Sequence, residues 1–277
     1  MGRNLTMPDM ELRALALTAL QHNDPDRKVR AVCAAWPLAA DLVIDPTQHL
    51  LPQQAVPGRP TRPRLIKPAD VPQRSPYTRL GLAALMHAVC HIEFNAINLA
   101  LDAIWRFPHM PREYYLDWWR VAVEEAGHFL MVRDHLRSLG HEYGDFDAHN
   151  GLWAMCEETA DDVTARMALV PRTLEARGLD ATPIIQAKLR KVGTPQAKAA
   201  VAVLDVILRD EIGHVAIGNH WFHRLCQQQG LDPLAHDRLL QERHRAPRLK
   251  PPFNLSARQS AGFSPQEMSQ WTGQGQK

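Results

Sequence analysis

The stretches Val121-Ala-Val-Glu-Glu-Ala-Gly-His128 and Leu204-Asp-Val-Ile-Leu-Arg-Asp-Glu-Ile-Gly-His214 decide the fold. Each places a glutamate three residues before a histidine: Glu125 before His128, and Glu211 before His214. Residues three apart on an α-helix lie on the same side, about one turn apart, so a carboxylate and an imidazole can bind one metal ion together. Two such pairs therefore predict two metal ions.

Two further glutamates complete a repeated pattern. Glu93 precedes the first pair by 32 residues, and Glu175 precedes the second pair by 36 residues. One glutamate from each of two helices, with a Glu-x-x-His from each of the other two, is the arrangement of di-iron and di-manganese carboxylate bundles. The predicted metal ligands are Glu93, Glu125, His128, Glu175, Glu211 and His214.

The residue types suit this chemistry. Four carboxylates compensate the charge of two ferrous ions and can bridge them, and two imidazoles add nitrogen ligands that suit iron. The predicted cofactor is therefore a pair of Fe ions, with Mn or a mixed Fe/Mn pair as the alternative. Coordination positions left open by the protein would admit oxygen.

Other interpretations of these residues stay open from the sequence alone. The Glu-x-x-His pairs could be exposed ion-pairing side chains, and His87 or His91 could bind in place of Glu93. Glu157 and Glu158 compete with Glu175, although they lie near the start of their helix, where acidic residues interact with the helix dipole.

Three residues are predicted to lie behind the ligands. Glu124 and Asp210 each precede a ligand histidine by four residues, and metal-bound histidines usually donate their second N–H to a carboxylate. An ordinary surface carboxylate is the competing interpretation of both. His91 is the third, with a place in the core as its alternative. The aromatic group from Tyr114 to Trp119 is interpreted as core packing.

Helical periodicity extends over most of the chain, and no segment shows the alternation typical of a strand. Two short helices are expected within 9–44, with Asp9 and Asp24 as N-caps. Four long helices are expected at 78–105, 111–139, 151–177 and 194–230, with a short helix near 183–191. Gly140, Gly178 and Gly230 are the expected C-terminal ends, and Pro171 is expected to kink the third helix.

The predicted fold is all-α, a four-helix bundle with additions at both ends. Its predicted parts are an N-terminal helical extension (1–45), a proline-rich strap (46–77), the bundle with the dimetal site (78–230) and a C-terminal extension (231–277). The strap contains eight of the 21 prolines, a density that prevents both helix and sheet. A disordered linker is the alternative for that segment.

Composition limits the partners and the compartment. The net charge of +2 over 277 residues does not by itself indicate nucleic acid, and the basic cluster between Arg238 and Lys250 is interpreted as a solvated face, with phosphate or tRNA contact as the alternative. No apolar run approaches the ~20 residues of a membrane span, and no secretory signal is evident. The four cysteines lack a C-x-x-C pair. A cytoplasmic protein with reduced thiols and no membrane partner is expected.

The chain resembles the ferritin-like di-iron carboxylate superfamily over residues 78–230. It looks most like an uncharacterised bacterial ferritin-like family, through Phe107-Pro-His-Met-Pro, Glu124-Glu-Ala-Gly-His-Phe, Gly144-Asp-Phe, Leu174-Glu-Ala-Arg-Gly-Leu-Asp, Arg209-Asp-Glu-Ile-Gly-His-Val-Ala-Ile-Gly-Asn219 and Pro252-Phe-Asn. The Glu-Ala-Arg at Glu175 is also similar to the tRNA-modifying di-iron hydroxylases. Glu124 and Asp210 stand where bacterial multicomponent monooxygenases carry an acidic residue before the ligand glutamate. Gly127 departs from the pattern, since relatives often have arginine there.

Three functions follow as expectations. The first is an O2-activating oxygenase or hydroxylase of a small organic substrate, in which the six ligands hold the redox centre. The second is a ferroxidase or other iron-handling protein with the same ligands. The third is a non-catalytic bundle that keeps metal for stability or acts as a binding module. A homodimer is compatible with all three.

Overall fold

The computed structural model describes residues 11–273, and in this range the protein is all-helical, as predicted. No strand occurs in that range, where the only β pairing consists of isolated bridges joining Glu11 to Val43 and Leu65 to Ala148. The chain divides between Asn150 and Gly151 into two compact units. Each unit has its own helices.

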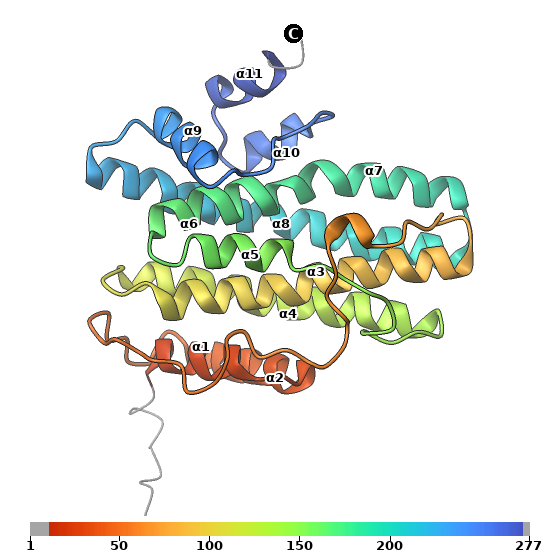
Figure 1. Ribbon diagram of the computed structural model, residues 1–277, viewed down its shortest axis with the longest axis horizontal. Coiled ribbons are helices and arrows are strands. Elements are labelled where there is room, and N and C mark those ends of the chain that lie inside the picture. Colours follow the sequence, from red (N-terminus) through yellow and green to blue (C-terminus); the bar gives the residue numbers. More distant parts are fainter. Residues whose placement is uncertain (1–10, 274–277) are drawn as a thin grey trace, which may run out of the picture. The chain divides into compact units, whose positions relative to one another are not determined.

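The first unit is built on a pair of long antiparallel helices, α3 and α4 (Figure 1). The helix α1 packs on α3, and α2 packs on α4. Its elements are α1 (Leu12–Gln21), α2 (Pro25–Ala35), η2 (Trp36–Leu38), η3 (Pro68–Asp70), α3 (Arg79–Arg106) and α4 (Arg112–Ser138). The predicted helices at 78–105 and 111–139 are confirmed. Because only five residues separate them, they fold back on each other.

Polar caps and glycines set the helix ends in this unit. Asp24 accepts a hydrogen bond from the backbone N–H of Arg27 at 2.7 Å, so its predicted role as N-cap is confirmed. Gly140 follows α4 with φ of 82°, the left-handed conformation expected there. The other predicted cap, Asp9, lies outside the described residues, and Glu11 caps α1 instead.

The strap of residues 46–77 is fastened to the first unit by backbone hydrogen bonds. The N–H of Gly58 donates to the carbonyl of Leu20 at 2.8 Å. A Cβ at Gly58 would lie 2.1 Å from the carbonyl oxygen of Gln21, so the close approach requires glycine. Further along, Ile66 and Ala148 pair through a bond of 2.9 Å from the N–H of Ile66 to the carbonyl of Ala148.

The helix α3 is long and apolar enough, by length and composition alone, to cross a membrane. This corrects the expectation that no stretch reaches that length. In the structure, 72% of the most apolar 18-residue stretch of α3 is buried. The core helix of a water-soluble protein shows the same combination, so α3 is weak evidence for a membrane span.

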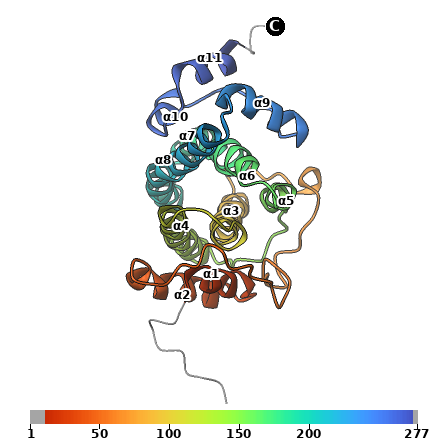
Figure 2. The ribbon, with the colours of Figure 1, turned by 90° about the vertical axis from the view of Figure 1, so that its left-hand side faces the viewer.

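The second unit is organised around the 35-residue helix α8. The segments α6, η4 and α7 pack along it; α9 contacts α6 and α8, and α10 contacts α7 and α8 (Figure 2). Its elements are α5 (Gly151–Glu158), α6 (Val163–Leu169), η4 (Val170–Glu175), α7 (Ala176–Val192), α8 (Pro195–Gln229), α9 (Pro233–Arg243), α10 (Leu255–Ser260) and α11 (Pro265–Gly273). The helix predicted at 194–230 is confirmed, and the hydroxyl of Thr194 accepts a hydrogen bond from the N–H of Ala197 as its N-cap.

The helices predicted at 151–177 and 183–191 have the wrong boundaries: residues 183–191 are helical but belong to α7, and the chain is interrupted at 159–162 instead. The helix ends at Glu158, and a new helix begins at Val163. Asp162 is the N-cap of the new helix, because its side chain accepts hydrogen bonds from the N–H groups of Thr164 and Ala165. The helix then widens into the π-helix η4, where the N–H of Ala176 reaches the carbonyl of Pro171, five residues back. The α-helical pattern resumes at once and continues through Gly178 and Pro183 to Val192.

The π-helix is how the chain accommodates Pro171. Proline has no N–H to donate and its ring collides with the preceding turn of an α-helix. Widening the turn relieves that collision without ending the helix. The hydroxyl of Thr173 donates to the carbonyl of Ala168 at 2.8 Å and so satisfies one acceptor at the irregular turn. The predicted disturbance at Pro171 is real, but it is a π-helix followed by more helix.

The tail of the second unit is fixed by buried arginines. Arg258 is fully buried and its guanidinium forms an ion pair of 2.6 Å with Asp180 of α7. The ring of Trp271 lies 4.6 Å from the same guanidinium carbon. Arg172 of η4 likewise forms ion pairs with Glu267 of α11 and, at 3.3 Å, with Asp237 of α9. The segments α9 to α11 are thereby held on α7 and η4.

Candidate metal centre

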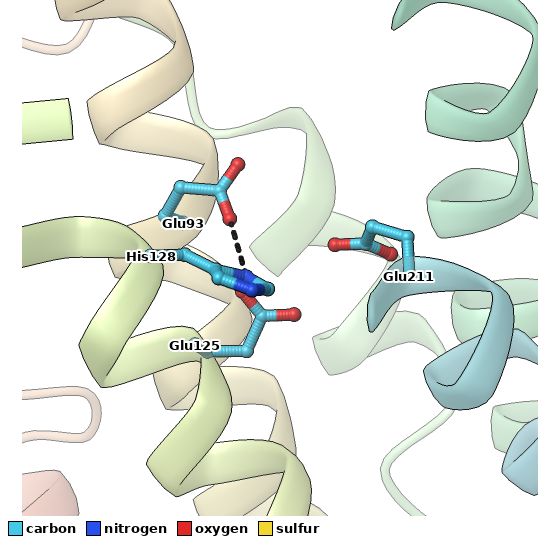
Figure 3. A group of neighbouring side chains, drawn as sticks. All are labelled: Glu93, Glu125, His128 and Glu211. Atoms are coloured by element: carbon cyan, nitrogen blue, oxygen red, sulfur yellow. Dashed lines mark hydrogen bonds and ion pairs between the residues drawn. The ribbon is translucent and has the colours of Figure 1, made fainter. Parts of the chain in front are cut away.

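Three of the predicted ligands meet between α3 and α4. Glu125 and His128 lie one turn apart on α4, and Glu93 extends from the middle of α3 (Figure 3). Glu93 is 3% exposed, and Glu125 and His128 are each 1% exposed. Uninterrupted helices fix these positions, because neither α3 nor α4 contains proline or a break between the ligand and its caps.

The donor atoms of these residues converge on one point. The Nδ1 atom of His128 lies 3.3 Å from an Oε2 atom of Glu93 and 3.3 Å from an Oε2 atom of Glu125. One ligand atom from each of the three lies within 4.8 Å of the others. Two carboxylates and an imidazole at this separation are suited to a first-row divalent ion.

The electrostatics of the cluster favour a positive charge. Burial by itself lowers the pKa of His128, but hydrogen bonds and charge from Glu125 and Glu93 outweigh it and raise that pKa to about 11. The imidazolium proton therefore compensates two buried carboxylates, whose charges are costly to bury alone. A bound cation would do the same, so the residues present fit a metal ion.

The second unit carries the second Glu-x-x-His pair on α8. The Nδ1 atom of His214 lies 3.8 Å from an Oε1 atom of Glu211. His214 is 1% exposed and Glu211 is partly buried. Each can offer one donor atom on the same side of the helix, as the spacing predicted.

Glu175 is the last residue of the π-helix and is partly buried. Its competitors from the sequence are used elsewhere. Glu157 is exposed and accepts a hydrogen bond of 2.9 Å from the indole N–H of Trp153, and Glu158 is exposed 3.9 Å from His244. Glu175 is less exposed than Glu157 and Glu158, as is expected of a metal ligand in a helical bundle.

The residues predicted to support the ligands have varied surroundings. Asp210 pairs with Arg209 at 2.8 Å, and Glu124 is partly buried on α4. The Nδ1 atom of His91 lies 2.9 Å from the hydroxyl of Tyr143, and its Nε2 atom lies 3.1 Å from the carbonyl of His149. Both ring nitrogens of His91 are therefore engaged by the 141–150 loop.

The aromatic group at the start of α4 is core, as predicted. Tyr114, Tyr115, Trp118 and Trp119 are all buried, with 3% exposure at most. The hydroxyl of Tyr115 donates to the carbonyl of Phe107 at 2.9 Å. The indole N–H of Trp119 donates to the carbonyl of Val32 in α2 at 3.3 Å.

A family model described as "Protein of unknown function (DUF455)" matches residues 21–269. The chain belongs to that family. A protein of Haemophilus influenzae (strain ATCC 51907 / DSM 11121 / KW20 / Rd), described as an uncharacterized protein, is 46% identical over 262 residues, covering 91% of this chain and 90% of its own. No solved structure matches the chain.

The family assignment confirms the expected likeness to an uncharacterised bacterial family. The match includes both Glu-x-x-His pairs, Glu93 and Glu175, and most of the strap and tail. Neither description carries a reaction or a ligand.

Proposed function

We propose that this protein is a dimetal carboxylate oxidoreductase of the ferritin-like type, an O2-activating oxygenase or hydroxylase of a small organic substrate. The observation that carries the proposal is the buried meeting of Glu93, Glu125 and His128, whose ligand atoms lie within 4.8 Å of one another. Two buried carboxylates beside an imidazole are costly without a cation. Iron or manganese suits these donors.

The full ligand set is proposed from the sequence pattern. Glu93, Glu125 and His128 would hold one side of the centre, and Glu175, Glu211 and His214 would supply the other, in a four-helix arrangement. A pair of iron ions bound there would supply redox chemistry toward O2. The glutamates would provide negative charge and bridging oxygens, and the histidines would provide neutral nitrogen donors.

His128 couples metal binding to protons. The Nδ1 atom lies 3.3 Å from an oxygen of each carboxylate, and a proton held there must leave before the nitrogen can bind a metal. Metal affinity should therefore increase with pH. The buried position of all three side chains keeps water from competing for them.

Metal analysis tests the proposal first. After anaerobic addition of ferrous ion and removal of the excess, two metals per chain are expected. Glu125→Gln and His128→Gln should each lower the affinity by roughly tenfold or more, because each removes one direct donor. Glu113→Gln is the matched control, since Glu113 is exposed on the same helix. Binding of no metal by the wild-type protein would refute the proposal.

The same measurement tests whether the two Glu-x-x-His pairs share one centre. If they do, Glu211→Gln should weaken the metal held by Glu125 and His128 as well as its own. If the pairs bind independently, each substitution should remove one metal and leave the affinity for the other unchanged.

Reaction with O2 separates the three functions. An oxygenase or hydroxylase should consume O2 when reduced and turn over an added organic substrate. A ferroxidase should consume O2 only in proportion to added ferrous ion, and a storage protein would form a large particle of 24 subunits by light scattering. A non-catalytic protein should lose thermal stability on chelation without losing any activity.

A further inference from the structure

A buried lysine joins three segments of the first unit to α2. Lys28 is 0% exposed, and its Nζ atom donates to the carbonyl of Leu20 in α1 and to the carbonyl of Gly58 in the strap, each at 3.0 Å. The third acceptor is the amide oxygen of Asn98 in α3. The ring of Phe94 lies 5.1 Å from the same Nζ atom. All of these groups are uncharged, so Nζ has acceptors on three sides but donates to no carboxylate among the residues that the structure describes.

The charged groups near Lys28 make its proton easy to lose. Burial, followed by the positive charge of Arg59 in the strap, lowers the pKa of Lys28 to about 7. On the α1 side, burial and the charge of Lys28 lower the pKa of His22. The acidic groups on α3 and on the α2–α4 contact are paired with arginines: Asp102 with Arg106, and Asp26 with Arg133, each at 2.6 Å. Both the ammonium and the neutral amine form of Lys28 are therefore accessible near neutral pH.

The amide of Asn98 has the orientation that the ammonium form requires. An ammonium group has only donors to offer, so the amide oxygen must face it and Nδ2 must point the other way. A pocket between the strap and α3 is lined by Asn98 but not by Lys28, so the Nδ2 end faces this strap pocket. Asn98 is 1% exposed, and its Nδ2 atom has no hydrogen-bond partner among the residues that the structure describes.

The neutral amine requires a different arrangement. It has two N–H donors and one lone pair, so it cannot donate to three acceptors at once. The carbonyls of Leu20 and Gly58 belong to the backbone and cannot exchange a donor for an acceptor. Asn98 can, because rotation of its terminal amide by about 180° exchanges the oxygen and the nitrogen at little steric cost. Nδ2 then donates to the lone pair of Lys28, and the amide oxygen faces the pocket.

We propose that Asn98 is a protonation-dependent switch, whose amide turns over when Lys28 loses its proton and changes the group offered to the strap pocket from an N–H donor to a carbonyl acceptor. The neighbouring polar groups of the pocket are already engaged: Nδ2 of Asn95 donates to the carbonyl of His91 at 2.8 Å, and the Tyr143 hydroxyl is paired with Nδ1 of His91. The strap side of the pocket is apolar, with Pro60, Pro63 and Leu65. A small neutral ligand with an acceptor oxygen then suits the ammonium form, and one with a donor suits the neutral form.

Nuclear magnetic resonance of the full-length protein, labelled with 15N at lysine and asparagine, tests the switch directly. The Nζ signal of Lys28 reports its protonation, and the Nδ2 protons of Asn98 report the amide. Over a range from about pH 5 to about pH 9, both signals should change with one common midpoint near 7. Above the midpoint, nuclear Overhauser effects from the Nδ2 protons of Asn98 to the Lys28 side chain should increase several-fold, and those to residues of the strap pocket should decrease.

Asn219 is the matched control within the same protein. Its amide oxygen accepts a hydrogen bond from Arg172 at 2.6 Å, and its Nδ2 atom donates to the carbonyl of Ala261 at 2.6 Å. A guanidinium keeps its charge over this pH range, so the Asn219 signals should stay constant.

The variant Lys28→Met should make the Asn98 signals independent of pH, whereas Lys67→Met, at an exposed lysine, should titrate like the wild type. The wild-type titration decides the question even if Lys28→Met does not fold. A Lys28 that stays an ammonium ion up to about pH 9 would overturn the proposal. So would a Lys28 that titrates while the Asn98 amide signals, or the pattern of its Overhauser effects, remain unchanged.

Discussion

Substitution of Gly218 by alanine should destabilise the second unit, although alanine is the better helix former. Gly218 is buried on α8 opposite the π-helix, and a Cβ there would lie 2.5 Å from both Cβ and Cγ of Pro171. Carbon atoms pack best at about 3.5–4.0 Å. The two segments would have to separate by roughly 1 Å, and neither the proline ring nor the helix backbone can rotate away.

Gly213 provides the comparison on the same helix. It is exposed, and no atom lies within 4 Å of a Cβ built on it. Gly213→Ala should therefore stabilise the protein by about 1 kcal/mol through helix propensity alone. Gly218→Ala gains the same amount but loses about 1–3 kcal/mol through overpacking. The two variants should differ by about 1–3 kcal/mol.

Urea unfolding followed by far-ultraviolet circular dichroism measures this difference. With a slope of about 1–3 kcal/mol per molar urea, the midpoint of Gly218→Ala should fall below that of Gly213→Ala by about 1 M. Because the chain has two units, the comparison applies to the transition that the two variants shift. Equal midpoints would refute the close contact between Gly218 and Pro171.

Three further predictions concern buried charge and thiols. Burial lowers the pKa of Lys28 from 10.5 to about 7. Between these pH values the unfolded state binds more protons than the folded state, so the free energy of unfolding should rise with pH, by up to about 5 kcal/mol. In urea titrations at a series of pH values, Lys28→Met should abolish this rise, and Lys67→Met, at an exposed lysine, should not. Cys33 is the one exposed cysteine of four. A thiol reagent should therefore modify one thiol quickly in the native protein and none in Cys33→Ser. Rapid modification of two thiols would contradict the burial of the other three cysteines. Arg258→Met should lower the free energy of unfolding by about 3–5 kcal/mol, because it leaves the Asp180 carboxylate without its cation. In thermal melts, the double variant Arg258→Met/Asp180→Asn should recover part of this loss.

The sequence predicted those parts that depend on one helix or on a short connection. The hairpin of α3 and α4 follows from two long periodic segments with five residues between them. The convergence of Glu125 and His128 follows from the helix repeat alone. The glycine ends at Gly140 and Gly230 follow from local backbone preference.

The sequence did not predict the features that depend on contacts between residues far apart in the chain. Helix propensity argues against a continuous helix through Pro171, Gly178 and Pro183, and only the missing side chain of Gly218 on another helix makes room for the proline ring. The buried hydrogen bond from Lys28 to Asn98 was not predicted, because the two residues are separated by 70 positions and meet only when α2 and α3 come together. The signal that could have indicated it is that Lys28 shares a face of α2 with the buried Val32 and Ala35.

The π-helix bears on the candidate metal centre through geometry. One extra residue in a helical turn rotates everything after it by about 100° relative to an ordinary α-helix. Glu175 is the last residue of that turn, so its direction depends on the widening at Pro171, and the widening depends on Gly218. Glu175, the predicted ligand with the least support from the sequence, therefore lies in the irregular π-helix of the second unit. Irregular turns of this kind are frequent at functional sites, which is an argument for retaining Glu175 in the proposed ligand set.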